Sequence, residues 1–341
     1  MPVGSGTALG WGSLLAFGAE TTWGTQVTAT AAFEFLSESL RKDIDEKRLE
    51  SIGTGRAFAR RVQTNVSVAG SVEWNFHPVE AIPLLKHALM GTVTSAQVGV
   101  TVAYNHTFTA GDMTAITQRG LTFEKRVGSD TTTAFIFNGC RVNSLKLEGA
   151  VGEPIKATME LIGRDATTGA FFTSTVAYSS LRPFMFQDVT FFVDGTIASI
   201  TSTSSESIIS FELEIANNLQ SEDQSRSIGS TVLTALPPGK RDIKLSFSQR
   251  YDTTTAWTRF TGGTRQAIRL RFDTGITIGA ALTTYAMFID LPAVYFNSAV
   301  PEIGESGIIT HDINVSPIAD TTSNTGTDII VSLTNSVTTY A

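Results

Sequence analysis

The sequence predicts an all-β protein with one or two short helices, and three observations lead to that prediction. Of its 341 residues, 48 are threonine, a β-branched residue that favours strands. From Val62 to His77 the even positions are mainly apolar and the odd positions polar, which is typical of a long strand with one face toward water. Several shorter alternating runs follow, separated by Gly, Thr and Asp, as in β-sandwiches and barrels.

The shorter runs give the expected order of elements along the chain. Strands are predicted over Leu121–Val127, Ala134–Phe137, Val142–Glu148, Ile155–Leu161, Ile209–Ile215, Ile243–Phe247, Ile268–Phe272, Ile309–Val315 and Ile329–Leu333. A helix is predicted over Val79–Met90, because apolar residues recur every three or four positions after Pro78 and Gly91 follows. A second short helix is predicted near Thr254–Phe260.

Composition limits the classes of function. The chain holds 25 Lys and Arg against 32 Asp and Glu, a formal net charge of −7, which argues against gripping nucleic acid or an anionic membrane through overall charge. The single cysteine, Cys140, excludes an internal disulfide and a cysteine-rich zinc site. No basic-then-apolar leader opens the sequence and no apolar run is long enough to span a membrane. We therefore expect a protein made in the cytoplasm without a membrane segment.

Sequence motifs for catalysis or cofactor binding are missing. There is no phosphate-binding loop, no nucleophile elbow and no histidine pair at zinc spacing. His77 and Glu80 stand at the start of the predicted helix and Cys140 follows an apolar run, so structural roles are favoured for all three. We predict no enzyme activity, no catalytic residues, no cofactor and no metal.

An internal repeat divides the chain. Ser51-Ile52-Gly53 recurs as Ser227-Ile228-Gly229, 176 positions later, and each copy precedes an alternating strand and then a short helix. Phe33-Glu34-Phe35 is matched with Phe184-Met185-Phe186. The expected organisation is an N-terminal arm over 1–30, which has no visible core of its own, and two β domains over 31–178 and 179–341. The alternative is one long β domain with recurrent Thr- and Gly-rich strands.

The run Phe17 to Thr25 resembles the opening G-x-E-x-x-aromatic-G-T of the tail tube (major tail) proteins of long-tailed bacteriophages. The resemblance continues through the Phe-x-Phe strand, the charged loop ending near Ser51-Ile52-Gly53, the strand Val66–Phe76 and the helix closed by Gly91. It covers about residues 14–165, and the second half fits only through the repeat.

This resemblance implies a structural virion protein. Two tandem tail-tube-like β-sandwich or barrel domains would let three chains close into a pseudo-hexameric ring. The alternative is one tube domain plus a C-terminal β-sandwich, with six chains in a ring. Stacked rings would form the hollow tail tube through which DNA passes into the host without specific binding. The implied partners are further copies of the chain, a tape-measure protein and tail terminator or tip proteins, and assembly would occur in the host cytoplasm.

Two sets of residues are candidates for function within this resemblance. The polar face of the strands is expected to line the lumen, with candidates Gln63, Asn65, Ser67, Ser71, Glu73, Asn75, Lys244, Ser246 and Ser248. The charged loops at 41–61 and 220–241 are expected to contact the next ring, with candidates Lys42, Asp43, Asp45, Glu46, Lys47, Arg48, Arg56, Arg60, Arg61, Glu222, Asp223 and Arg226.

Two other classes of function compete with the tube. A β-rich phage adhesin, fibre or capsid decoration protein would form discrete monomers or trimers without a lumen and would expose an aromatic patch such as Trp257 and Tyr251. A β-sandwich glycosidase would need two carboxyl groups about 5–9 Å apart in a cleft, and nothing in the sequence selects such a pair.

Overall fold

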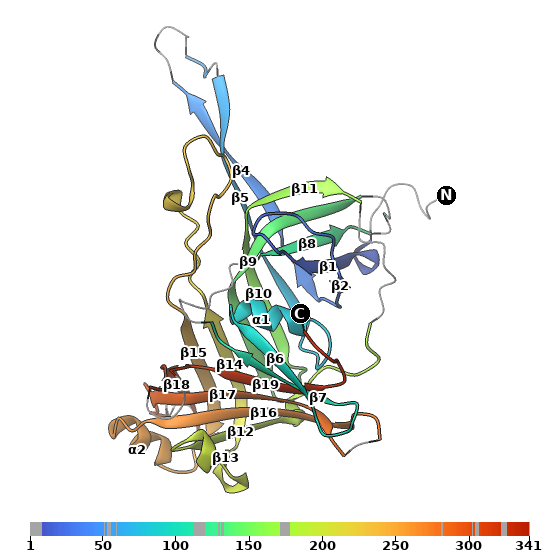
Figure 1. Ribbon diagram of the computed structural model, residues 1–341. Helices are drawn as coiled ribbons and strands as arrows, with labels where there is room; N and C mark the ends of the chain where they lie inside the picture. Colours follow the sequence, from blue (N-terminus) through green and yellow to red (C-terminus); the bar gives the residue numbers. More distant parts are fainter. Residues whose placement is uncertain are drawn as a thin grey trace.

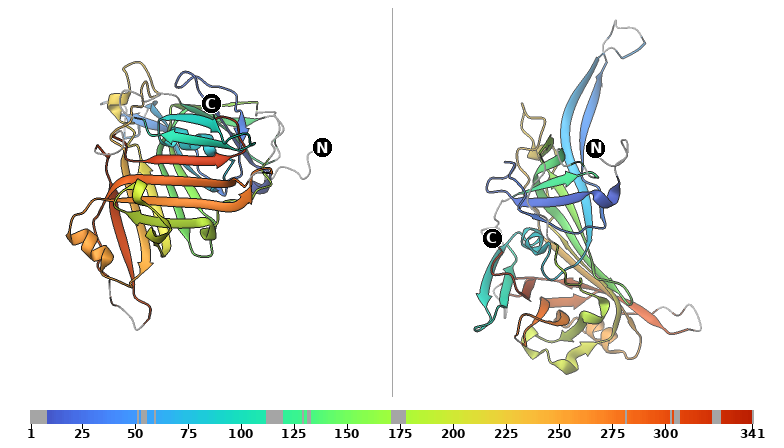
Figure 2. Two further views of the ribbon diagram at one scale, coloured as in Figure 1. Left: turned by 60° about the horizontal axis from the view of Figure 1, so that its bottom comes forward. Right: turned by 90° about the vertical axis from the view of Figure 1, so that its right-hand side faces the viewer.

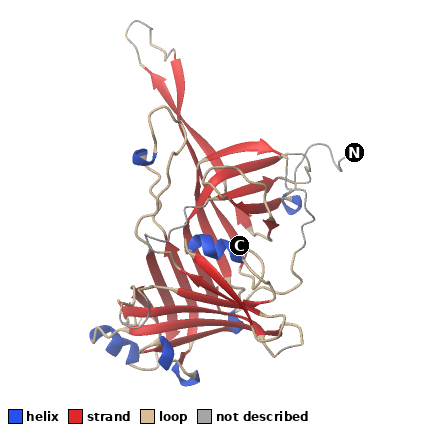
Figure 3. Ribbon diagram, in the orientation of Figure 1, coloured by secondary structure: helices blue, strands red, loops and turns tan. Residues whose placement is uncertain are grey.

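The computed structural model describes the chain except residues 1–8, 51, 53–55, 59, 112–119, 129, 131–132, 171–177, 281, 302, 304–306, 322–325 and 341. Its described part is built almost entirely from antiparallel strands, with two short α-helices (Figure 3). The all-β prediction is therefore confirmed.

A central sheet runs through both halves of the chain. Its strands, in the order in which they pair, are β4 (Arg41–Leu49), β5 (Arg60–Asn75), β10 (Lys156–Gly163), β9 (Ala134–Ala150), β14 (Ile208–Ala216), β15 (Asp242–Arg250), β18 (Thr310–Pro317) and β17 (Thr284–Phe296). The short β3 (Ser37–Glu38) also pairs with β5, beside β4. The pairing of β9 with β14 joins the two halves into one sheet.

Two smaller groups of strands branch from β9 and β17. The first part of β9 pairs with β8 (Leu121–Arg126) and β11 (Asp165–Gly169), and β8 pairs with β1 (Leu14–Ala19), which pairs with β2 (Ala31–Ala32). In the second half β17 pairs with β16 (Gln266–Thr277) and β19 (Ile330–Asn335), and β16 pairs with β12 (Val189–Asp194), which pairs with β13 (Ser205–Glu206). Figure 1 shows the first group above and the second below.

The two halves follow the same order of pairing. The run β4–β5–β10–β9 in the first half matches β14–β15–β18–β17 in the second. The branch β2–β1–β8–β9–β11 likewise matches β13–β12–β16–β17–β19. The hairpin of β6 (Thr92–Gln97) and β7 (Tyr104–Thr109) belongs to the first half alone among the described residues, and β7 pairs with β19 of the second half.

Two α-helices and five 3-10 helices complete the described structure. Helix α1 (Ile82–Ala88) lies against β9 and buries Ile82, Leu84 and Leu85. Helix α2 (Thr255–Thr261) occupies the corresponding place after β15. The 3-10 helices are η1 (Gly10–Gly12), η2 (Phe186–Asp188), η3 (Ile197–Ser199), η4 (Ser202–Ser204) and η5 (Asp223–Ser225). One large cluster of buried apolar side chains extends through both halves, so the halves share a core.

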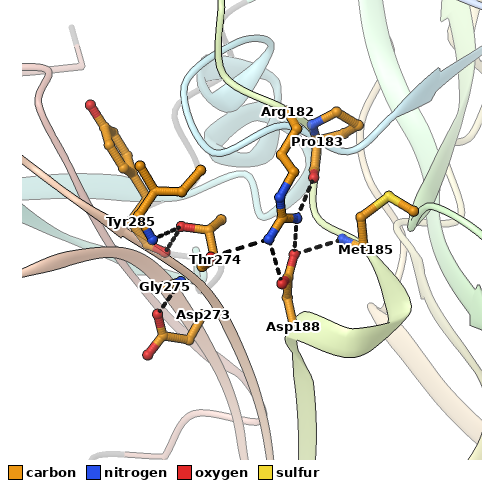
Figure 4. Close-up of polar contacts among 9 residues, drawn as sticks. Arg182, Pro183, Met185, Asp188, Asp273, Thr274, Gly275 and Tyr285 are labelled. Atoms are coloured by element: carbon orange, nitrogen blue, oxygen red, sulfur yellow. Dashed lines mark hydrogen bonds and ion pairs between the residues drawn. The ribbon is translucent and has the colours of Figure 1, made fainter.

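The connection between the halves is fixed by polar contacts (Figure 4). Arg182 forms an ion pair with the buried carboxylate of Asp188 and donates from Nη2 to the backbone oxygen of Thr274 at 3.1 Å. The hydrogen bond to Asp188 raises the pKa of the Arg182 guanidinium. The Phe184 backbone extends the sheet, because its N–H donates to Phe76 O and its oxygen accepts from Ile155 N. These contacts hold the second half in a set orientation.

Most sequence-based elements are confirmed with small shifts at their ends. The long strand predicted over Val62–His77 is β5, and the helix predicted over Val79–Met90 is the shorter α1. The predicted strands Ala134–Phe137 and Val142–Glu148 form the single strand β9. The strand continues because Gly139 adopts a φ of +64°, which a glycine tolerates without strain, and β8 and β11 pair with this part of β9.

The expectation of an N-terminal arm over 1–30 is wrong for the described residues. Strand β1 lies between β2 and β8, and its Leu15, Ala16 and Phe17 are buried in the core of their own chain. A short strand with both faces covered has no period-2 alternation, so it escapes a search for that pattern. Residues 1–8 lie outside the described part.

Among the described residues, no helix has the length and apolar character needed to cross a membrane.

Candidate functional surfaces

One face of the central sheet is polar across six strands. A single row of directly opposite residues runs Asn75, Lys156, Glu148, Glu212, Ser246 and Asn314, from β5 through β10, β9, β14 and β15 to β18. The adjacent row begins at Glu73 and ends at Lys244. The structure thus brings Ser71, Glu73 and Asn75 onto the same face as Lys244, Ser246 and Ser248, although about 170 residues separate the two groups.

The other three residues predicted on this face lie elsewhere. The last β10 partner of β5 is Gly163, opposite Val68. Gln63, Asn65 and Ser67 precede that position and lie where β5 extends beyond the end of β10 and has only β4 as a partner strand among the described residues. They belong to a projecting hairpin, which sequence alternation could not distinguish from the rest of the strand.

The polar face is acidic and hollowed. Along its six strands, apart from the buried Arg141 of β9, the described ionisable side chains are seven carboxylates and four bases: Glu73, Glu148, Glu160, Glu212, Glu214, Asp242 and Asp312 against Lys146, Lys156, Lys244 and Arg250. A depression of about 510 Å³ lies on it, lined by residues of β9, β10, β14, β15 and β18. Lys146 Nζ lies 2.9 Å from Glu212 and 3.1 Å from Glu148, and the hydrogen bond to Glu212 is the largest cause of its raised pKa.

The opposite face of these strands is the core. Val68, Val72 and Trp74 of β5 are buried, as are Leu213 of β14 and Leu245 of β15. The alternation along each strand therefore has a simple cause, because one side packs into the shared cluster of buried apolar side chains and the other meets water.

The charged segment predicted as a loop at 41–61 is a β-hairpin. Strand β4 and the first part of β5 pair from Arg41 opposite Ala69 to Leu49 opposite Arg60, and they project well beyond the rest of the molecule (Figures 1 and 2). Every residue of β4 is exposed. The loop expectation fails because a strand with water on both faces shows no apolar alternation.

The candidate contact residues are distributed along this hairpin. Lys42, Asp43, Asp45, Glu46, Lys47 and Arg48 lie in β4, Arg60 and Arg61 lie in β5, and Arg56 lies in the exposed connection between them. Ion pairs link Arg41 to Asp43 at 2.8 Å and Arg61 to Glu46 at 2.9 Å. Ser51 and Gly53 of the repeated motif lie outside the described residues. Exposed apolar side chains, Ile44, Leu49, Phe58 and Val62, accompany the charges.

The second candidate loop, at 220–241, packs along its own chain. Arg226 donates to Val66 O at 3.0 Å and to Thr231 O at 2.8 Å, while Val66 N donates to Thr231 O at 2.8 Å. The loop thereby covers the edge of β5 just beyond the end of β10. Glu222 and Asp223 are exposed beside it, at the start of η5. Arg226 is thus an anchor within the chain, a role that sequence reasoning missed.

The residues of the opening motif form a buried polar centre. Both oxygens of the fully buried Glu20 carboxylate accept hydrogen bonds, from Gly24 N at 2.7 Å, Gly139 N at 2.7 Å and Thr122 Oγ1 at 2.9 Å. Trp23 Nε1 donates to Gly139 O at 2.9 Å. The glutamate and the tryptophan of the motif therefore tie the N-terminal segment to Gly139 of β9.

Two arginines complete this centre. The guanidinium groups of Arg141 and Arg164 lie 5.5 Å and 5.9 Å from the Trp23 ring centroid. Burial lowers the pKa of Arg141 to about 10, although the charge of Glu20 acts in the opposite direction. Arg164 donates to Gly24 O at 3.1 Å and to Leu233 O at 3.1 Å, so the centre also anchors the loop at 220–241. The polar side chains of this centre contact one another and the backbone around them, so we assign the centre a structural role.

Cys140 is buried next to this centre, and burial raises the pKa of its thiol. His77 accepts hydrogen bonds at Nδ1 from the backbone of Val79 and Glu80, as a residue at a helix start does. Among the described residues, no three His, Cys, Asp or Glu side chains are grouped so as to hold a metal.

Comparison with known proteins matches most of this chain to one family. Residues 10–317 match the model of a family described as phage tail tube protein. No curated protein sequence matches the chain significantly.

Proposed function

We propose, from the premise that the chain belongs to the phage tail tube protein family, that copies of it close into rings that stack into a hollow tube for DNA. Membership of that family makes the protein a structural component of the virion tail. The ring, the tube and the passage of DNA through it are what the proposal adds.

The continuous polar face of the central sheet supports this function best. A closed ring of such sheets would turn a wall of carboxylates, serines and lysines toward the lumen. Each phosphate that a protein neutralises adds affinity for DNA through counterion release, so a wall with more carboxylates than bases does not retain DNA in transit. Ring closure would also protect the open edges of the sheet, which otherwise invite uncontrolled pairing.

We further propose that the chain is a tandem duplication and that three chains form a pseudo-hexameric ring. The repeated pairing order of the strands and the matching positions of α1 and α2 support this. In this correspondence β12 follows Phe184 and matches β1, which precedes Phe33, so the Phe-x-Phe match does not join equivalent positions. The Ser-Ile-Gly match does fit, because both triplets fall between corresponding strands.

The projecting hairpin is the proposed contact between rings. It exposes both charged and apolar side chains, and it extends away from the body of the molecule along the axis of β5. The proposed partners beyond the tube itself are a tape-measure protein within the lumen and terminator or tip proteins at the ends. Assembly in the host cytoplasm is part of the same proposal.

Electron microscopy of the purified chain with mass photometry tests the function. Hollow rings or tubes in units of three chains are expected. Units of six would support one tube domain per chain and a decorating second half. Compact monomers without a lumen at any concentration would overturn the tube and favour an adhesin or decoration protein.

A further inference from the structure

The pairing of β9 with β14 joins the two halves inside the chain. The strands that correspond to β14 and β9 in the repeat lie at the two outer edges of the central sheet. At one edge, the described residues of β3 and β4 pair only with β5. At the other edge, the chain leaving β17 runs beside β18 and has no strand on its far side among the described residues. By the repeated pairing order, β4 matches β14 and this segment matches the last part of β9.

The register of strand pairing in each half shows which residues of the two halves correspond. Lys156 lies opposite Asn75, and Thr310 lies opposite Arg250 at the corresponding end of β15. Lys156 of β10 therefore corresponds to Thr310 of β18. Six residues further along each strand, Ile162 corresponds to Ser316, and so their partners Arg141 and Tyr295 correspond to each other. Asn143-Ser144 of β9 therefore corresponds to Asn297-Ser298, and the two residue types are identical.

Side-chain directions agree with this correspondence. Leu145 is buried and Lys146 lies on the polar face; at the matching positions Ala299 is 0% exposed and Val300 is 59% exposed. Asn297 N donates to Asn314 O at 2.8 Å, which keeps the segment beside β18 as a strand would lie. The segment already has the alternation of a sheet strand while its outer side has no partner strand.

The opposite edge is placed in the same way. Glu214 lies opposite Lys244, and Arg41 lies opposite Ala69, the position that matches Lys244. Arg41 therefore corresponds to Glu214, whose partner across the internal junction is Lys146. A hollow of about 820 Å³ adjoins this edge, and Trp74, among its lining residues, has a buried Nε1 without a hydrogen-bond partner.

We propose that Asn297–Val300 of one copy pairs antiparallel with Arg41–Ile44 of a second copy, in the register of the internal junction, with Val300 opposite Arg41 and Ser298 opposite Asp43. This rests on the proposed function, since the pairing closes the ring. Pro301 corresponds to Leu147 and has no N–H, so the pairing ends at Val300. The stem of Arg41 covers Val300 in this arrangement.

Cysteine cross-linking tests the register. Directly opposite residues in antiparallel strands have Cα atoms about 4.5–5.5 Å apart, which suits a disulfide. The double variant Arg41→Cys/Val300→Cys should give linked dimers and trimers on a non-reducing gel after mild oxidation. Both side chains are exposed, so neither change disturbs the core. Cys140 is buried and leaves the background clean.

The matched control is Lys42→Cys/Val300→Cys, which moves one thiol by one residue to the other face of the sheet and should not link. Rings in the microscope with linkage of 41 to 300 but not of 42 to 300 would support the junction. Rings without linkage of 41 to 300, or with stronger linkage of 42 to 300, would overturn the junction and leave the tube intact. If the unmodified chain forms no rings, the proposed function is wrong, and the junction that rests on it is wrong as well.

Discussion

At the scale of single residues, Glu20 shows how a family motif can be structural. Its carboxylate accepts hydrogen bonds from two backbone N–H groups and one hydroxyl, in full burial. In Glu20→Gln, the side-chain NH2 group would replace one of these oxygens and could not accept the hydrogen bond from the donor that faces it. We expect the free energy of unfolding in urea to fall by about 2–3 kcal/mol, the cost of leaving a buried donor without a partner.

Glu34→Gln is the matched control for this measurement, because Glu34 is exposed on the same segment of the chain. Its unfolding free energy should stay within about 0.5 kcal/mol of the unmodified protein. Equal effects of the two substitutions would show that the hydrogen bonds of Glu20 do not stabilise the fold.

His106 gives the fold a dependence on pH. It is fully buried in β7, with Ser95 Oγ at 2.7 Å from Nδ1 and Asn335 Oδ1 at 3.1 Å from Nε2. Burial lowers its pKa below the usual 6.5, although the hydrogen bond with Asn335 opposes the shift. The folded state therefore binds fewer protons than the unfolded state, and stability present above pH 6.5 is lost as the pH falls toward the folded pKa.

Thermal unfolding at pH 7 and pH 5 measures this effect. We expect the melting temperature to fall between the two, and to fall less in His106→Gln, which stays neutral. The pKa of His311 is also lowered by burial, but that residue is common to both proteins and cancels in the comparison. The same fall in both proteins would remove His106 as a cause.

At the scale of elements, the projecting hairpin should be separable from the fold. Glu46 lies opposite Gln63, so replacing residues 47–62 with Asn-Gly joins two facing residues through a two-residue turn. We expect an unchanged melting temperature, because every residue of β4 is exposed, and rings that no longer stack. Microscopy counts rings and tubes, and tubes of normal length would exclude the hairpin as the contact between rings.

A charge variant separates the contribution of charge from that of length. Arg60→Glu/Arg61→Glu keeps the hairpin and reverses two bases at its outer end. If charge sets the register of stacking, this variant should also fail to form tubes at low salt. If apolar contact dominates through Phe58 and Leu49, tubes should persist.

The sequence was most informative for elements with one wet face. Strand β5, β10, β14 and β15 were placed within a few residues, because burial on one side imposes period-2 alternation. Strand β1, covered on both sides, and β4, exposed on both sides, lack that signal. The continuity of β9 through Gly139 depends on tertiary contacts with Glu20, which no local pattern reports.

The candidate site was predicted unevenly for the same reason. Alternation identified the polar face of β5 and β15, but the strands that connect them, β10, β9 and β14, follow only from pairing. Alternation also could not show that Gln63 and Asn65 lie beyond the end of β10, in the projecting hairpin. The role of Arg226 depends on the position of Val66, 160 residues away, and has no sequence signature.

At the scale of the whole molecule, the charge of the polar face should control how the tube treats DNA. Glu73 and Glu160 lie opposite uncharged residues of the neighbouring strands, so Glu73→Lys/Glu160→Lys changes the wall by four charges per chain without creating a facing pair of lysines. We expect tubes of this variant to bind double-stranded DNA, with affinity falling steeply as salt rises.

The neutral variant Glu73→Gln/Glu160→Gln changes the charge half as much and should bind DNA more weakly than the lysine variant. Sedimentation of tubes with labelled DNA at two salt concentrations measures both. Equal and salt-independent binding by the unmodified protein and both variants would show that this face does not contact DNA.

The hairpin of β6 and β7 breaks the equivalence of the two halves, since the described residues of the second half have no counterpart of it, and its strand β7 extends the β17–β19 pairing of the second half. In a ring of three chains, six sectors of wall would therefore carry only three such hairpins. The tube would have true threefold rotational symmetry, visible as a 120° repeat in averaged cross-sections. A tail protein that binds through these hairpins would find three identical sites per ring. Its copy number would then follow the number of chains in the ring and not the number of tube-like halves.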